Sequence, residues 1–219
     1  MPFTEQQFFE VMARYNQAVW PAQLALNAMA IAILVLASRG LQTSRWISAL
    51  LALLWVWTAI AYHATFFRQI NPAAVVFAIF FIAEAGLLVW YGVIGGRLIF
   101  LLRGSAWHVV GTALIAYALV IYPLLGLAFG QRYPEMPTFG LPCPTVIFTL
   151  GLLMWSRPTA PFVVWVVPFM WALLGMQAAV LFGVREDYGL TVAGALAVLY
   201  WYARWQTTQA RPKPRSSSA

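Results

Sequence analysis

Charged residues are scarce in this sequence. They make up 9% of its 219 residues, whereas 63% are hydrophobic. Soluble domains average about 25% charged residues, so this composition excludes an ordinary soluble domain. Several apolar runs follow one another with only short polar breaks, and a membrane-spanning helix needs about 20 mostly apolar residues. The sequence therefore predicts one membrane domain of the all-α class, a polytopic helix bundle.

Cysteine and lysine are nearly absent. Cys143 is the single cysteine, which excludes an internal disulfide and a multi-cysteine metal cage. Lys213 is the single lysine and lies near the end of the chain, so a retinal-type Schiff base inside the membrane is excluded. The net charge of +7 is scattered over the predicted loops rather than gathered on one face, which argues against nucleic acid as a partner.

Familiar catalytic signatures are also missing. The sequence contains no HExxH, no GxSxG, no Walker loop and no carboxylate pair suited to a divalent metal. The two histidines, His63 and His108, lie about 20 Å or more apart along the membrane normal when helix rise is counted. A haem held between them is therefore excluded, and we expect neither a cofactor nor an enzyme of a familiar class.

A capping box predicts where the N-terminal helix begins. Thr4 is followed three residues later by Gln7, which is the spacing of that motif. Residues 5–19 mix large apolar side chains with Glu, Gln, Arg and Asn, as is typical of an amphipathic helix lying in the membrane interface. Trp20-Pro21 then predicts a bend, because the residue before a proline is disfavoured in helical geometry.

Seven apolar runs follow this interfacial helix, and we predict that each spans the membrane. They are residues 21–38, 46–66, 72–95, 107–129, 143–156, 160–183 and 187–204. The membrane domain then covers residues 1–204. The remaining residues, 205–219, are polar, basic and interrupted by proline, which predicts a disordered cytoplasmic tail.

The loops between these runs divide by charge when they are assigned to alternate sides of the membrane. One side carries Arg39, Arg45, Arg97, Arg103, Arg157, Arg204, Arg211, Lys213 and Arg215 and no acidic residue. The positive-inside rule places this side in the cytoplasm, so the N-terminus is expected outside and the C-terminus inside. The expected partners are the lipid bilayer and anionic headgroups at the cytoplasmic face, and self-association into a homo-oligomer stays open.

The fifth run is too short to cross a bilayer by itself. From Cys143 to Arg157 the helix would rise about 21 Å, whereas the hydrocarbon core is about 30 Å thick. The segment before Cys143 must then dip into the membrane. Irregular backbone at that depth is tolerated only inside protein or against a water-filled cavity. Pro144 suits the first helical position, because its missing N–H would have no partner there.

Several polar side chains are predicted at the level where this short helix begins. Counting from the arginines of the cytoplasmic loops places Glu84 about 20 Å and Tyr117 about 21 Å above the inner boundary. A helix start also offers free N–H groups and a partial positive charge. We predict a polar binding or transport layer formed by Glu84, Tyr117, Cys143, the N–H groups near Thr145, and Asn27.

Each strong candidate has a structural alternative. An acidic residue at a helix centre costs about 2.5–3.5 kcal/mol, so Glu84 should face the bundle interior, as a proton or cation site or as a hydrogen-bonded carboxyl. Cys143 lies between two prolines and is a weak soft-metal candidate or a small apolar residue in a rigid turn. His63 is expected near the outer mouth, where it relays protons or makes an interfacial hydrogen bond.

Three stretches carry a resemblance to a known family. The most specific is an F-G-x-P-C-P-T-x-I-F-T run at residues 139–149, and the others are PFTEQQFF at residues 2–9 and the stretch from Tyr15 to Pro21. They are similar to a bacterial family of integral membrane proteins known as a domain of unknown function. The resemblance covers most of the chain except the tail. It implies a protein of the bacterial inner membrane and no catalytic residue.

Three functions fit these observations. The first is a small-solute or ion transporter or permease with an intramembrane polar site around Glu84. The second is a non-catalytic membrane scaffold or a subunit of a membrane complex. The third is a thiol-dependent membrane enzyme that uses Cys143.

Overall fold

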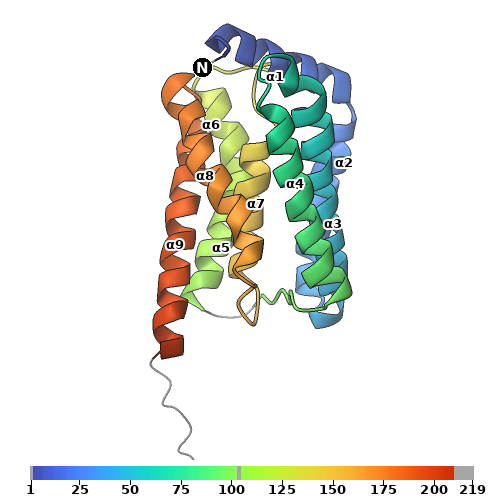
Figure 1. Ribbon diagram of the computed structural model, residues 1–219, viewed down its shortest axis with the longest axis vertical. Coiled ribbons are helices and arrows are strands. Elements are labelled where there is room, and N and C mark those ends of the chain that lie inside the picture. The colour runs from blue at the N-terminus through green and yellow to red at the C-terminus, as the bar shows by residue number, and fades with distance from the viewer. Residues whose placement is uncertain (1, 103–104, 210–219) are drawn as a thin grey trace, which may run out of the picture.

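A computed structural model of the chain describes residues 2–102 and 105–209 (Figure 1). In this part of the chain the regular elements are helices, and the only β-type pairings are isolated bridges. The all-α prediction is therefore confirmed. Arg103 and most of the predicted tail lie outside the described residues.

A helix lies in each of the seven predicted runs, and one more precedes them. The elements are α1 (Glu5–Val19), α2 (Ala22–Ser38), η1 (Leu41–Thr43), α3 (Ser44–Trp57), the π-helical η2 (Thr58–Phe66), η3 (Phe67–Gln69), α4 (Ala74–Leu88), the π-helical η4 (Val89–Ile94), α5 (Ala106–Ala116), the π-helical η5 (Tyr117–Ile121), α6 (Tyr122–Ala128), α7 (Pro142–Met154), α8 (Val163–Leu181), η6 (Arg185–Asp187) and α9 (Tyr188–Gln209). Helix α9 thus continues five residues beyond the boundary at residue 204 where the tail was predicted to begin.

Helix length and composition support fewer membrane spans than the seven predicted. Within the described residues, four helical segments are long and apolar enough to cross a membrane: Leu41–Gln69, Ala74–Ile94, Ala106–Ala128 and Val163–Leu181. A fifth is added if α1 and α2 are taken together as one bent span. Helix α7 is apolar but has only 13 residues, and α9 is not among the four. Helix length and composition alone therefore do not support seven spans.

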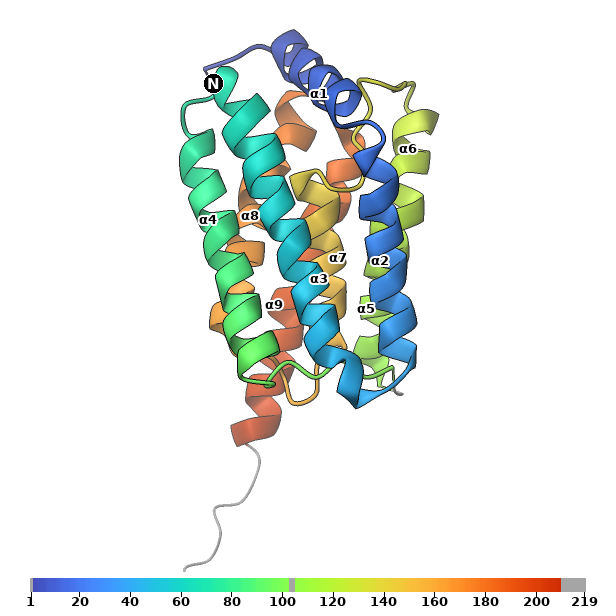
Figure 2. The ribbon, with the colours of Figure 1, turned by 90° about the vertical axis from the view of Figure 1, so that its right-hand side faces the viewer.

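Helix α1 lies across one end of the bundle (Figures 1 and 2). Its capping box is confirmed, because Gln7 N donates to Thr4 Oγ1 at 3.2 Å and Thr4 N donates to Gln7 Oε1 at 2.8 Å. The predicted bend at Trp20-Pro21 is also present, and α1 and α2 meet there at 83°. The bend turns the chain from the α1 end of the molecule into the bundle.

The remaining helices run alternately toward and away from the α1 end (Figures 1 and 2). The connections at the opposite end, called here the far end, adjoin Arg39, Arg45, Arg97 and Arg157, and the last turns of α9 carry Arg204. Among the described residues, all six Asp and Glu except Glu84 belong to α1 or to connections at the α1 end. The two ends of the bundle therefore differ in charge.

Helix α7 is the central helix of the bundle. Twelve of its 13 residues are buried. It touches α5 backbone to backbone, since a Cβ added to Gly111 would lie 2.5 Å from Gly151 O, and one added to Gly151 would lie 2.7 Å from Gly111 O. Trp55 Nε1 donates to Thr149 Oγ1 at 3.0 Å from α3. Because α7 packs against protein on its sides, its length does not have to match a lipid bilayer.

The segment before α7 enters the bundle without regular structure. Gly140 has a φ of 100°, a conformation that favours glycine, and its carbonyl accepts a hydrogen bond of 3.0 Å from Thr58 Oγ1. Nearer the α1 end, Asn16 Nδ2 donates to the carbonyls of Pro134 at 2.6 Å and Met136 at 2.8 Å. The irregular backbone is thus satisfied by protein, as the length of the fifth run requires.

Candidate functional site

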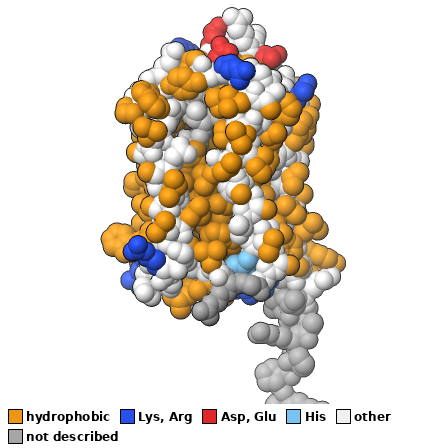
Figure 3. Space-filling view, turned by 180° about the vertical axis from the view of Figure 1, so that it is seen from behind, with side chains coloured by type: hydrophobic (Ala, Val, Ile, Leu, Met, Phe, Trp, Pro, Cys, Tyr) orange, Lys and Arg blue, Asp and Glu red, His pale blue; other side chains and the backbone are white. Residues whose placement is uncertain are grey.

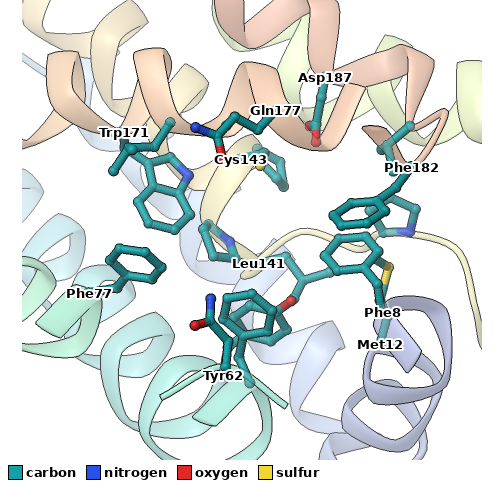
Figure 4. A pocket seen from close by; sticks show the side chains of 18 of the residues that line it. Phe8, Met12, Tyr62, Phe77, Leu141, Cys143, Trp171, Gln177, Phe182 and Asp187 are labelled. Carbon is teal, nitrogen blue, oxygen red and sulfur yellow. The ribbon is translucent and has the colours of Figure 1, made fainter. Parts of the chain in front are cut away.

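A cavity of about 330 Å³ lies under α1 at the start of α7 (Figure 4). Its walls come from α1, η2, η3, α4, α6, α7, α8 and the connections at the α1 end. Aromatic side chains dominate the surface, among them Tyr62, Phe77 and Trp171. A mainly apolar, concave site with a few polar groups is what small-molecule binding sites have in common.

Aromatic contacts hold α1 over the cavity as a roof. Phe8 of α1 stacks on Phe182 with ring centroids 4.9 Å apart, and Phe3 meets Phe67 edge to face at 5.5 Å. Arg14 also donates to Gln69 Oε1 at 3.1 Å at the surface. These contacts keep α1 packed against the helices that line the cavity.

Asp187 provides a carboxylate in the cavity wall and is only 2% exposed. Tyr122 Oη donates a hydrogen bond to Asp187 Oδ1, and the Cys143 thiol lies beside the same carboxylate (Figure 4). Burial raises the pKa of Asp187 from its ordinary 3.8 to about 7, although the hydrogen bonds from Tyr122 and Cys143 lower it. The carboxyl group therefore changes charge near neutral pH.

The turn between α8 and α9 places this carboxylate. Gly183 adopts a φ of 64° at the end of α8, and η6 closes with a hydrogen bond of 3.0 Å from Asp187 N to Val184 O. Glu186, the preceding residue, is fully buried, and burial raises the pKa of this carboxyl too. Two acidic residues of one short turn are thus directed into the protein rather than into solvent.

Cys143 is the one residue of the predicted polar layer that lines the cavity. Thr145, two residues further along α7, is fully buried, and its hydroxyl has no hydrogen-bond partner in the described structure. Its backbone N–H donates to Leu141 O at 3.3 Å, so that N–H is already used within the protein. The start of α7 therefore contributes side chains to the cavity, and the N–H of Thr145 is not free for a ligand.

Glu84 and His63 lie outside the cavity lining, deeper in the bundle. Both are fully buried, and neither the carboxylate oxygens of Glu84 nor the ring nitrogens of His63 have a hydrogen-bond partner in the described structure. The His63 ring packs against Phe81 at 4.8 Å and Trp171 at 5.0 Å. The interfacial hydrogen bond considered for His63 is thus not seen. Trp171 therefore contacts His63 and also lines the cavity, whereas His63 does not line it.

Tyr117 and Asn27 also lie apart from the cavity. Tyr117 Oη donates to Glu186 O at 2.7 Å, and its ring covers Gly189 so closely that a Cβ there would lie 2.1 Å from it. Asn27 is half-buried and donates to the carbonyl of Gln23, one turn earlier in α2, at 2.9 Å. The predicted layer is therefore not one cluster, because its members face different neighbours.

Sequence reasoning missed Asp187 and Tyr122, and it also missed a polar network at the bend. Gln23 Nε2 donates to Asn16 Oδ1 at 2.7 Å, and Thr138 Oγ1 donates to the same oxygen at 2.8 Å. A usable signal existed for this network, since Asn16 and Gln23 flank the Pro21 bend seven residues apart. For Asp187 the signal was weak, because it lies in a loop predicted on the outer side, where acidic residues are common.

A metal site around Cys143 gains no support from its surroundings. The described residues contain no group of three or more His, Cys, Asp or Glu side chains that could hold a metal ion. Next to the Cys143 thiol, the groups that contact it are the Asp187 carboxyl and the aromatic cavity wall. The arrangement is suited to holding an organic molecule by shape, aromatic contact and one carboxylate.

Comparison with known proteins supports the resemblance found in the sequence. No curated protein and no solved structure matches the chain. One family model does match, over residues 5–211, and its description is a family of unknown function, DUF6064. This match covers nearly the whole chain, including the bend, the central helix and all residues that line the cavity except Pro2 and Phe3. The chain therefore belongs to the DUF6064 family of unknown function.

Proposed function

We propose that this chain is an integral membrane permease with seven spans that binds a small, mainly apolar solute in the cavity under α1. The observation that carries the proposal is the cavity itself, which lies at the start of a buried central helix with one carboxylate in its wall. Broken or shortened helices that end at a binding site are a recurring device of transporters.

The outer surface supports a location in lipid. On the face shown in Figure 3, hydrophobic side chains cover the wall between the two ends, and acidic side chains gather at one end. Large apolar side chains point outward along the helices, such as Leu173, which is 73% exposed, and Val109, which is 71% exposed. Soluble monomers rarely expose apolar surface on this scale, whereas lipid chains accept it.

Two further observations favour seven spans. Helix α9 runs the length of the bundle beside α8, from the α1 end to the far end, and carries Arg204 in its last turns (Figure 1). Helix α7 is shorter but is surrounded by protein, so it does not need that length. The arginines at the far end favour a cytoplasmic position for that end and an outer position for α1 and its cavity.

Glu84 and His63 make permeation through the bundle a better fit than simple binding. Ionisable residues inside membrane bundles are costly and mark solute or proton pathways. Neither side chain has a hydrogen-bond partner in the described structure, and the His63 ring contacts Phe81, which lies three residues before Glu84 on α4. We assign them the role of proton-binding groups that couple movement of the bundle to solute passage.

The single native cysteine provides the test, because it lines the cavity. A permease must open its site to each side in turn, so Cys143 should react with membrane-impermeant methanethiosulfonate reagents added outside and, at a different rate, inside. Right-side-out and inverted vesicles measure the two rates. Reaction from the outside alone would identify a receptor or scaffold, and no reaction from either side would remove the cavity as a site.

Glu84→Gln tests the coupling role in the same vesicles. This variant should lose reaction of Cys143 from one side while it inserts normally, because a neutral amide cannot release the proton that drives the change. Glu135→Gln is the matched control, since Glu135 is exposed in the connection before α7. Equal two-sided reaction in both variants would contradict coupling through Glu84.

A further inference from the structure

We propose that the solute taken by this cavity is a small organic cation with an apolar body, such as a quaternary or tertiary ammonium compound, whose charge is held beside Asp187. The inference rests on the proposed function and deepens it, because it names the chemical class of the solute. Three observations support it: the charges of the residues that line the cavity, their aromatic surfaces, and the absence of an opposite charge beside the Asp187 carboxylate among those residues.

The charge of the lining is one-sided. Among the described residues that line the cavity, Asp187 is the only Asp or Glu, and none is Lys or Arg. An anionic solute would therefore meet a carboxylate with no basic side chain to offset it. A cation would supply the charge that the buried carboxylate lacks, and a buried charge is retained only when it is paired.

The uncharged lining also suits a cation. Tyr62, Phe77 and Trp171 form the wall away from the carboxylate (Figure 4). Trp171 meets Phe77 edge to face, with ring centroids 5.3 Å apart and planes at 83°. Because this wall lies away from Asp187, it would receive the apolar body of the solute while the charge stays beside the carboxylate.

Asp187 has hydrogen-bonding and charge capacity to spare. Tyr122 Oη donates to one of its oxygens, and the Cys143 thiol is its other protein partner. An ionised carboxylate accepts about four hydrogen bonds. These two partners are dipoles rather than opposite charges, which agrees with the raised pKa of this carboxyl. A tertiary ammonium would donate a hydrogen bond to this carboxylate, whereas a quaternary ammonium has no N–H and would pair with it by charge alone.

A matched pair of probes tests the class of the solute. Benzyltrimethylammonium and neopentylbenzene have the same shape, but only the first is charged. In nanodiscs the cation should bind to the wild-type chain about tenfold more tightly than the neutral isostere, as expected for a buried charge pair. Isothermal titration calorimetry measures both affinities. Asp187→Asn should remove the preference, and Glu135→Gln should retain it.

The outcomes separate this inference from the proposed function. Equal binding of the two probes, with no effect of Asp187→Asn, overturns the cationic class and leaves the cavity as a site for neutral solutes. Tighter binding of phenylmethanesulfonate than of the cation also overturns it. Absence of binding by all three probes overturns the proposed function together with the inference.

A second measurement needs no substitution at Asp187, in case that variant fails to fold. Cys143 adjoins the carboxylate, so the wild-type thiol should react faster with cationic trimethylammonium-ethyl methanethiosulfonate than with anionic sulfonatoethyl methanethiosulfonate. The ratio of the two reaction rates is normalised to the same ratio for a cysteine at position 135 in a chain that also carries Cys143→Ser. Position 135 is exposed. A normalised ratio of one or below overturns the inference, and a ratio of about ten supports it.

Discussion

Two buried polar regions of this bundle differ in how completely their hydrogen bonds are made. At the bend between α1 and α2, Asn16 and Gln23 bond to each other, to Thr138 and to backbone carbonyls of the segment before α7. Deeper in the bundle, Glu84 and His63 have no hydrogen-bond partner in the described structure. Satisfied polar groups indicate a structural role, whereas unsatisfied ones need a functional explanation.

Asp187 in the cavity wall is intermediate in character between these two regions. It has protein partners in Tyr122 and Cys143 but no opposite charge among the described lining residues. In the proposed function, the first region holds the chain, Asp187 binds the solute, and Glu84 and His63 carry protons. The following predictions test these roles, from the largest expected effect to the smallest.

Asn16→Ala should strongly destabilise the protein. The substitution removes the donor to two carbonyls and the shared acceptor of Gln23 and Thr138. Each buried group left without a partner costs about 1–3 kcal/mol, so a loss of about 3–5 kcal/mol is expected. Denaturation in detergent micelles measures it. Gln6→Ala, which removes an exposed bond to Glu10, is the control and should cost little. Equal stability of the two variants would contradict a structural role for the network.

Cation binding should depend on pH through Asp187. The pKa of its carboxyl is about 7, so the group is mostly protonated at pH 6 and mostly ionised at pH 8. Affinity for benzyltrimethylammonium should therefore rise about tenfold between these pH values and be lost as pH falls through 7.

Other titratable groups also face this carboxyl. Tyr62, Tyr122, Cys143 and Glu186 all influence it, and Glu186 has a raised pKa of its own. Calorimetry on Asp187→Asn isolates the contribution of Asp187, since that variant should show a flat profile. A wild-type profile that is also flat, or that falls with pH, would rule out the carboxylate as the cation's partner.

Glu84→Leu should leave stability unchanged or raise it by about 1 kcal/mol. The carboxyl is fully buried without a partner, and replacement of such a group by an apolar one of similar size is often neutral or stabilising. The same denaturation measurement tests it. The opposite signs expected for Asn16→Ala and Glu84→Leu sharpen the comparison, and a loss of several kcal/mol in Glu84→Leu would show that this carboxyl is structural.

Phe8→Ala should loosen the roof of the cavity with little effect on the bundle. The ring stacks on Phe182 and touches Phe67, and these contacts keep α1 over the cavity. Reaction of Cys143 from the outer side should become severalfold faster, as measured by mass spectrometry of the labelled protein. The matched variant is Phe9→Ala, because Phe9 is adjacent on α1 but does not line the cavity. An unchanged rate in Phe8→Ala would place the entrance elsewhere.

Local signals in the sequence were sufficient for the helices and for several of their ends. Thr4 and Gln7 marked the start of α1, and Pro21 marked the bend, because capping and proline geometry involve only neighbouring residues. The short length of α7 could be counted directly, and the structure supplies its reason, which is that protein surrounds it. The number of membrane spans and the orientation of the chain remain predictions.

The composition of the candidate site could not be read in the same way. Counting helix rise gives the height of a residue but not the direction of its side chain around the helix axis. Glu84 and Cys143 were placed at one height, yet Cys143 faces Asp187, and Glu84 is not among the residues that line the cavity. Asp187 was treated as a loop acid because nothing local shows that η6 turns inward.

The sequence by itself determined an all-helical chain with an N-terminal helix, a bend and a short central run, since hydrophobic length, capping and proline act over a few residues. Only the tertiary structure decided which polar groups meet. The close approach of Gly111 and Gly151 seats α7 against α5, and the turn after Gly183 brings Asp187 to Cys143. Such contacts join residues far apart in the chain, and they depend on how whole helices pack.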